Sequence, residues 1–456
     1  MTTPLQTFSE QVTTHQYLVA FFYAFATVGV MLGVAAIILI DAGLVKRQNL
    51  IDTIVQKVLS TFIAGTAFMV FGYGIWNWQY YQAFEVPNAL SVAIKDWSIF
   101  GNNLLHFSQN IDPKAVAEGD TFQIFSVFFF AFAGLTAILI QGAGLERLKA
   151  SANYITSAVV GAIVVPVAAY LTYGSASPLT NAGLHDFVGA YCLYMVVGVW
   201  AVVLAWRLGP RHGGVAAPGH FSLLTVGVLL LLLAIPMFVI GCGFMVPEAG
   251  YFGPTLATSG LGIVFTNVFM SFAGGALTGG FLAYRYRKPA YILLGPVAGY
   301  VSCSALFDVA MPWQAFAISL AGPFILAGGE RLLKAVGIDE PKVAPLALGP
   351  SIYSVLMAGI VGAGVPQGGF FGIKEGAFAF QHSTVSLGMQ VLGLVVIIAL
   401  TAVTAFIVTY LIEKTVGLRV PHEQEVNGLD QSIWQVSEAA VPSYSDISRP
   451  VQSIAS

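Results

Sequence analysis

Apolar residues fill this chain in eleven long stretches that are separated by shorter polar breaks. A helix needs roughly 20 mostly apolar residues to cross a lipid bilayer, and each stretch is about that long. Because eleven is an odd number, the two ends of the membrane domain should lie on opposite sides. The pattern therefore predicts an all-α polytopic membrane protein with helices at residues 17–41, 55–76, 122–145, 153–174, 187–207, 221–242, 255–284, 289–308, 312–330, 346–364 and 385–412.

The polar breaks are basic at every second loop, where they read LVKRQN, ERLKAS, WRLGPRHGG, YRYRKP and ERLLKAVGIDEPK. Of the 19 Lys and Arg residues, only Lys95, Lys114 and Lys374 fall on the other side. Because basic loops remain in the cytoplasm, we expect the N-terminus outside and the C-terminus inside. A membrane domain, residues 1–412, is then followed by a polar cytoplasmic tail, residues 413–456, of which we expect the first half to be ordered.

Composition agrees with this assignment, since 57% of the 456 residues are hydrophobic and only 9% are charged. A water-soluble domain carries about 25% charged residues, so a soluble enzyme and a structural protein are excluded. The net charge of −3 gives no indication of nucleic-acid binding. The segment MTTPLQTFSEQVTTHQ at the N-terminus contains no Lys or Arg, and we expect no cleaved signal peptide.

Chemistry-bearing residues are rare within the predicted spans. Asp186 begins the fifth span, Asp308 ends the eighth and Glu146 ends the third, whereas the middle of each span is free of His, Lys and Arg. The three cysteines, Cys192, Cys242 and Cys303, lie in apolar runs without a CxxC spacing and should be free thiols. The pattern offers no catalytic residues, no metal site and no cofactor, and it favours a permeant that is small and weakly polar or easily deprotonated.

Several short motifs, in order along the chain, resemble those of the Amt/Mep/Rh ammonium transporter family. They are AGLVKRQN (42–49), GAGLER (142–147), DFVG (186–189), LGPR (208–211), IDEP (338–341) and, closest of all, GLRVPHEQEVNGLD (417–430), which is similar to the family's cytoplasmic tail motif. The resemblance implies eleven transmembrane helices, arranged as two inverted five-helix repeats (spans 1–5 and 6–10) plus a C-terminal helix. It also implies a homotrimer in the cell inner membrane with one pore for ammonium or ammonia in each subunit.

The same resemblance implies roles for individual residues. Phe132 takes the place of the first gating phenylalanine, and Tyr173 and Cys242 replace the Trp and Ser of the family's outer ammonium site. The second gating phenylalanine falls on Phe238, although Phe244 offers a competing register. Asp186 matches the family's structural aspartate below the outer site, and its carboxylate could equally cap a helix. Phe132 is also compatible with an ordinary core or lipid-facing position.

The resemblance fails at the centre of the pore, where the family carries two facing histidines. The first falls on Tyr194, eight residues after Asp186, and the second falls on Leu348, eight residues after Glu340. A tyrosine keeps one hydroxyl group with a pKa of about 10, and a leucine offers neither a donor nor an acceptor, so the pore should be atypical. Prolines at positions 345 and 350 predict an irregular start of the tenth span.

Two interpretations remain open at this level. The chain is an ammonium transporter or channel with an atypical pore, or it is a non-conducting sensor on the same scaffold or a channel for another small neutral solute. The tail motif fits either interpretation. By resemblance, the expected partner at the cytoplasmic face is a trimeric signalling protein of the PII type.

Overall fold

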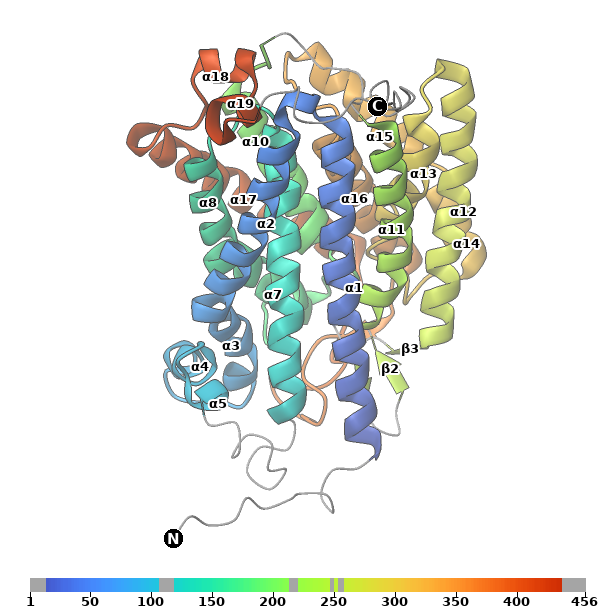
Figure 1. Ribbon diagram of the computed structural model, residues 1–456. Coiled ribbons are helices and arrows are strands. Elements are labelled where there is room, and N and C mark those ends of the chain that lie inside the picture. The colour runs from blue at the N-terminus through green and yellow to red at the C-terminus, as the bar shows by residue number, and fades with distance from the viewer. Residues whose placement is uncertain (1–13, 106–118, 213–219, 247–249, 253–257, 437–456) are drawn as a thin grey trace, which may run out of the picture.

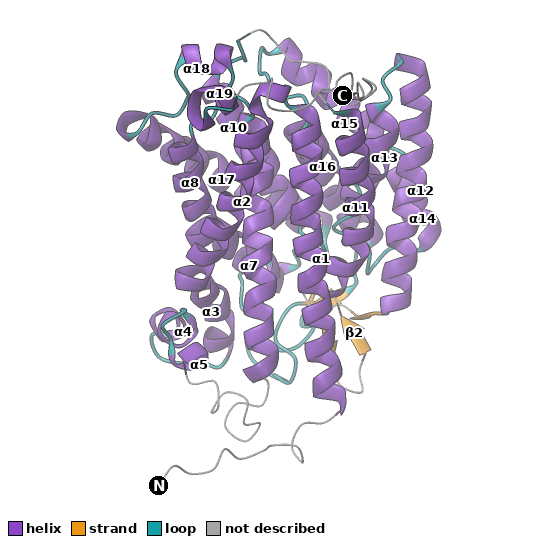
Figure 2. Ribbon diagram, in the orientation of Figure 1, coloured by secondary structure: helices purple, strands orange, loops and turns teal. Residues whose placement is uncertain are grey.

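The computed structural model describes the chain except for residues 1–13, 106–118, 213–219, 247–249, 253–257 and 437–456. Long helices run side by side from one end of the molecule to the other, and the few strands are short and lie towards one end (Figures 1 and 2). The start of the predicted span 255–284, Lys114 and the tail beyond residue 436 lie outside the described residues. We call the end that carries α18 and α19 the tail face.

The described helices and strands follow one another along the chain. The α-helices are α1 (Thr14–Leu44), α2 (Leu50–Ala67), α3 (Tyr73–Ala83), α4 (Ala89–Trp97), α5 (Asn102–Leu105), α7 (Gly119–Gln141), α8 (Ala150–Val159), α9 (Val165–Tyr173), α10 (Val196–Leu208), α11 (Phe221–Ile240), α12 (Leu261–Tyr286), α13 (Ala290–Val301), α14 (Pro312–Ser319), α15 (Gly322–Ala335), α16 (Val343–Val361), α17 (Leu387–Thr415), α18 (His422–Asn427) and α19 (Leu429–Trp434). Wider π-helical turns, η2 (Phe68–Gly72), η4 (Val160–Val164) and η6 (Ala190–Met195), join or extend some of them, and 3-10 turns lie at Arg47–Asn49, Gly142–Gly144 and Thr180–Ala182. The strands β1 (Phe244–Val246), β2 (Gly250–Phe252) and β3 (Thr258–Ser259) form one antiparallel sheet, and β4 (Pro366–Gln367) pairs with β5 (Ser383–Thr384).

Within the described residues, ten helical stretches are long and apolar enough to cross a membrane. Each coincides with one of the predicted spans, which confirms the all-α polytopic membrane fold. The eighth predicted span, 289–308, is the exception, because its helix α13 is only 12 residues long and ends at Val301. Residues 302–310 continue as turns instead of helix.

Protein groups satisfy the backbone of this non-helical segment. The carbonyl of Ser304 accepts a hydrogen bond from the Val188 amide at 2.9 Å, and the amide of Ala305 donates to the Ser354 hydroxyl at 2.9 Å. The Asn267 side chain donates to two more carbonyls of the segment, at 2.8 and 2.7 Å. Irregular backbone is tolerated at membrane depth only where protein satisfies it in this way, which explains why hydropathy alone does not reveal the break.

Helix α16 also differs from expectation, since it runs without interruption through Pro350. The irregular start predicted from the two prolines is therefore wrong. Pro345 lies in the first turn, where an amide hydrogen would have no helical partner in any case, so only Pro350 removes a hydrogen bond from the helix.

Close packing of α12 against α13 depends on four glycines, two on each helix at a spacing of four residues. A β-carbon on Gly295 would lie 2.5 Å from the Gly275 carbonyl oxygen, and one on Gly299 would lie 2.7 Å from the α-carbon of Gly275. A β-carbon on Gly279 would lie 2.8 Å from the α-carbon of Gly295. Small residues at this spacing let the backbones of membrane helices approach each other, which is how the second half of the bundle is joined.

The first half of the tail contacts loops of the membrane domain. The amide of Lys149 donates to the Leu418 carbonyl at 3.0 Å, and the amide of Val420 donates to the Arg147 carbonyl at 2.9 Å. Further along, the Asp430 carboxylate accepts hydrogen bonds from two backbone amides in the first turn of α2, at 2.8 and 3.0 Å. The tail therefore ties together the loops that precede α2 and α8.

We expect Gly295→Ala to destabilise the protein, because its β-carbon would overlap the Gly275 carbonyl and force α12 and α13 apart. Overpacking of this kind typically costs about 1–3 kcal/mol. Gly280→Ala is the matched control, since a β-carbon there meets only the flexible end of Ile292, at 3.3 Å. Thermal unfolding of the purified protein in detergent measures the effect, and equal unfolding temperatures for the two variants would contradict the close approach of these helices.

Candidate functional site

A small cavity between aromatic rings lies in the half of the bundle away from the tail face, and we call it the aromatic cavity. It has a volume of about 30 Å³ accessible to water. Phe132 on α7, Tyr173 at the end of α9 and Cys242 just after α11 all line it, so the structure brings together three residues that the sequence singled out. The full lining is Trp76, Phe125, Phe128, Phe129, Phe132, Tyr173, Gly241, Cys242 and Gly243.

Trp76 on α3 is a component of this cavity that sequence reasoning missed. Its ring centroid lies 4.9 Å from that of Phe129, and its indole Nε1 is buried without a hydrogen-bond partner in the described part of the chain. Tryptophan is the best aromatic partner for a cation. The cavity therefore contains an indole from another helix in addition to Tyr173, and the two tryptophans of the run GIWNWQ are the sequence signal that indicates it.

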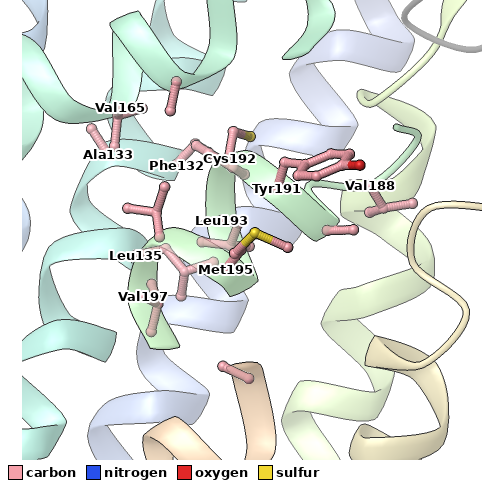
Figure 3. Close-up of a cluster of buried hydrophobic side chains, with 14 of the residues drawn as sticks. Phe132, Ala133, Leu135, Val165, Val188, Tyr191, Cys192, Leu193, Met195 and Val197 are labelled. Atoms are coloured by element: carbon pink, nitrogen blue, oxygen red, sulfur yellow. The ribbon is translucent and has the colours of Figure 1, made fainter. Parts of the chain in front are cut away.

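A second cavity, which we call the apolar cavity, lies between Phe238 and the start of α16. Its volume accessible to water is about 80 Å³, and since one water needs about 10–15 Å³, several water molecules would fit by volume. Figure 3 shows three of its wall residues, Leu135, Leu193 and Val197, within the buried core. The other lining residues are Val30, Gly33, Ile37, Ile40, Leu139, Tyr194, Val228, Leu231, Ala234, Ile235, Phe238, Leu294, Val297, Val301, Lys342, Val343, Leu346 and Ala347.

The two predicted gating phenylalanines lie on different cavities. Phe132 lines the aromatic cavity and Phe238 lines the apolar cavity, while the Cys242 thiol lies 3.6 Å from the Phe238 carbonyl oxygen. Phe244, the alternative position for the second gating phenylalanine, lies on strand β1, and its side chain is not among those that the structure describes. The residues that line the aromatic cavity are mostly aromatic, and those that line the apolar cavity are mostly aliphatic.

Tyr194, in the π-helical turn η6, lines the apolar cavity, and its ring lies edge-on to that of Tyr300 at a centroid distance of 6.2 Å. Tyr300 on α13 was not anticipated, although it is a tyrosine in an otherwise apolar run. Leu348 is not among the residues that line this cavity; a β-carbon on Gly198 of α10 would lie 2.6 Å from that of Leu348. The structure therefore places Tyr194, but not Leu348, on the cavity wall.

The helix caps in the two halves explain the position of Leu348. Asp186 accepts hydrogen bonds from the backbone amides four and five residues further on, at 2.9 Å each, whereas Glu340 accepts from those three and four residues further on, at 2.8 and 2.6 Å. Counted from the capped amides, the equivalent of Tyr194 is Ala347, which does line the cavity. The two halves therefore differ by one residue between the acid and the first capped amide, and Ala347 lies on the cavity wall while Leu348 packs against Gly198.

Asp186 acts as a helix cap and lines neither of these two cavities. Gly189, with a left-handed φ of 85°, accommodates the extra residue between Asp186 and the capped turn. The neighbouring His185 is buried, and its ring nitrogens lie 3.0 Å from an Asp308 carboxylate oxygen and 3.1 Å from the side-chain oxygen of Gln367. These groups hold the loop at the start of the fifth span in place.

A buried charge cluster closes the tail-face end of the apolar cavity, and we call it the Asp41 cluster. It consists of Asp41 on α1, Lys57 on α2 and Lys342 at the start of α16. The Lys57 ammonium lies 2.6 Å from Asp41 and also donates to the Ile138 carbonyl at 2.8 Å, while Lys342 donates a hydrogen bond to the other oxygen of Asp41. Both Asp41 and Lys57 are fully buried. They lie near the ends of the first two predicted spans, and neither of them was singled out from the sequence.

Beyond this cluster, a larger cavity opens towards the tail face, with a volume of about 490 Å³ accessible to water. We call it the tail-face cavity. Asp339 on its wall pairs with Arg211 at 2.8 Å and with Arg147 at 3.6 Å. Burial alone would raise the pKa of Asp339, but the hydrogen bonds and charges of the two arginines lower it to about 2. Asp339 therefore stays ionised and paired with the two arginines at neutral pH.

Within the described residues, no group of His, Cys, Asp and Glu is arranged to hold a metal ion. Cys192, Cys242 and Cys303 are free thiols. The rings of the aromatic cavity can attract a small cation, and the separate apolar cavity is lined at its tail-face end by Lys342.

Comparisons with known proteins agree with this architecture. The model that describes the Ammonium Transporter Family matches residues 20–439. The chain is 30% identical to the ammonium transporter Amt1 of Methanocaldococcus jannaschii over 67% of this chain and 74% of that protein, and 26% identical to an ammonium transporter of Bacillus subtilis over 90% and 95%. A solved sensor Amt protein shares the fold with a TM-score of 0.72 at 21% identity, over 92% of this chain and 98% of its own. Because the family model covers nearly the whole chain, the protein belongs to the ammonium transporter family.

Proposed function

We propose that this member of the ammonium transporter family carries ammonia across the membrane as the neutral molecule, through an atypical pore formed by the aromatic and apolar cavities. The observation that supports the proposal is the wall of the apolar cavity, where Tyr194 and Lys342 are the only polar side chains among the lining residues. A bare ammonium ion there would lose its hydration without replacement, which costs several kcal/mol. A neutral molecule avoids that cost.

Ammonium is first attracted to the aromatic cavity, where Trp76 and Tyr173 offer ring faces or edges and Cys242 offers a weak acceptor. Phe132 and Phe238 then separate this site from the apolar cavity and exclude water. Ammonium gives its proton to water on the outer side of the aromatic cavity, and the neutral ammonia molecule then enters the apolar cavity. There, the Tyr194 hydroxyl group can donate a hydrogen bond to the ammonia nitrogen or accept one from it.

We also propose the orientation and assembly that the sequence implies. The basic loops at the tail face support a cytoplasmic tail and an external N-terminus, so the aromatic cavity faces outwards. Family membership supports a homotrimer. The docked tail supports a regulatory role at the cytoplasmic face, with a PII-type protein as the expected partner.

Ammonia uptake into proteoliposomes tests the proposed function. An inward ammonium gradient should make the interior alkaline faster than in protein-free liposomes, because neutral ammonia binds protons after entry. A fluorescent pH indicator inside the vesicles records the rate. Rates equal to those of protein-free liposomes would contradict the proposal and favour a non-conducting sensor or a channel for another neutral solute.

We expect Trp76→Leu to weaken the apparent affinity for methylammonium. The loss of a desolvated cation–π contact costs about 1–2 kcal/mol, which corresponds to roughly 5- to 30-fold. The control is Trp206→Leu. Trp206 lies on α10, is 58% exposed and is not among the residues that line this cavity. Concentration dependence of labelled methylammonium uptake gives the affinity, and an unchanged value for Trp76→Leu would remove Trp76 from the outer site.

Docking of the tail on the membrane domain should depend on Arg419. Its guanidinium binds Glu425 at 2.9–3.0 Å and donates to the Leu208 and Pro210 carbonyls at 2.7 and 2.8 Å. We expect Arg419→Gln to release the tail and to lower the uptake rate, since hydrogen bonds to charged groups contribute about 1.5–3 kcal/mol each. The control is Lys334→Gln, at an exposed position on the same face. Limited proteolysis reports the release. A tail that stays as resistant as in the control would contradict this account of docking.

A further inference from the structure

Lys342 stands at the boundary between the apolar cavity and the tail-face cavity. Of the residues that line these two cavities, only Lys342 and Leu294 line both. The Lys342 side chain is 14% exposed, and its ammonium group is held by a hydrogen bond to Asp41. A molecule that moves from one cavity to the other therefore passes directly beside this ammonium group.

The Asp41 cluster contains two lysines and one carboxylate, and both amino groups lie within hydrogen-bond reach of Asp41. The nearest acids on the loop before α16 are already engaged. Glu340 accepts hydrogen bonds from the first amides of α16, and Asp339 pairs with Arg211 and Arg147. The positive end of the α16 dipole also lies at Lys342. The tail-face cavity, into which the inner mouth of the apolar cavity leads, is lined by five basic residues (Arg147, Arg211, Arg287, Lys288 and Lys342) and three acidic ones (Glu330, Asp339 and Glu340), so basic groups are in excess there.

A purely structural role does not account for this excess. Lys57 lies 2.6 Å from Asp41 and is sufficient to neutralise its buried carboxylate. A second lysine adds a desolvated charge that the ion pair does not need, and such a charge is costly in a low-dielectric interior. Lys342 is thus a second lysine beside Asp41, and it lies on the wall that the two cavities share, which points to a role towards a molecule that passes there.

We propose that Lys342 is a selectivity residue, whose fixed ammonium group excludes cations from the inner mouth of the pore while neutral ammonia passes. This inference rests on the proposed function, in which the apolar cavity is the conduction path. Repulsion between two positive charges is strong where little water separates them. Ammonia is not repelled, and its lone pair can accept a hydrogen bond from the Lys342 ammonium group on the way through.

Three variants separate the charge of Lys342 from its size and from the general charge of the cavity. Lys342→Met removes the charge at similar length, and Lys342→Arg keeps it. Lys288→Met removes a lysine that is 63% exposed on the same tail-face cavity and is the matched control. For each protein, internal alkalinisation measures ammonia uptake, and currents in ammonium and potassium gradients measure cation passage in the same vesicles.

We expect the cation current, relative to the ammonia uptake of the same vesicles, to rise by about tenfold or more in Lys342→Met alone, whereas Lys288→Met should leave both unchanged. Lys342→Met with normal ammonia uptake and no added current would overturn the inference, and so would an unmodified protein that already conducts cations. An unmodified protein without ammonia uptake would instead overturn the proposed function. The two failures are therefore distinct.

A chemical variant covers the case in which Lys342→Met does not fold. Lys342→Cys, purified once, is treated with a methanethiosulfonate that carries either an aminoethyl or a neutral methyl group. The aminoethyl reagent restores an ammonium group and should abolish the cation current, whereas the methyl reagent should leave it. Unmodified protein treated in parallel controls for Cys192, Cys242 and Cys303. Equal currents after the two treatments would overturn the inference.

Discussion

Desolvation of charge is the constraint on which this helix bundle depends. A charged group inside the bilayer must be paired, neutralised or moved to an end. The described residues obey this rule: the wall between Phe238 and α16 is apolar, and the buried ions at its tail-face end lie in the Asp41 cluster. The same constraint acts on what is transported. A passage that cannot replace the hydration of an ion selects for a molecule that has given up its charge.

The two ends of the passage deal with charge in opposite ways. In the proposed function, aromatic rings around Trp76 and Tyr173 attract a cation at one end, and in the further inference Lys342, which lines the other end, repels it. We propose that this polarity takes over the part that the resemblance assigns to the family's paired histidines. Selection for the neutral form is then distributed along the passage and does not rest on proton transfer at its centre. The tail contacts the loop that carries Arg147. Arg147 in turn pairs with Asp339, three residues before Lys342. The contacts that dock the tail are therefore linked to those at the inner mouth of the apolar cavity.

Hydropathy was sufficient to predict ten of the spans, because length and apolar content decide whether a helix crosses a membrane. The break after Val301 was not predictable, since the groups that satisfy its backbone come from distant helices such as the one that carries Asn267. Family motifs placed Phe132, Tyr173 and Cys242 on one cavity. They could not find Trp76, which lies on a different helix, or the one-residue difference between the caps of Asp186 and Glu340. The pairing of Lys57 with Asp41 is not evident from the sequence, because it depends on how the ends of the first two spans pack together.

The central claim is that the transported species is neutral, and it is tested most directly by the charge moved per ammonia molecule. Electrical current and nitrogen uptake can be recorded on the same batch of proteoliposomes under one ammonium gradient. The account predicts far less than one elementary charge for each molecule taken up. A ratio of one charge per molecule would contradict it, because an intact cation, or a proton travelling with ammonia, would then cross the apolar cavity.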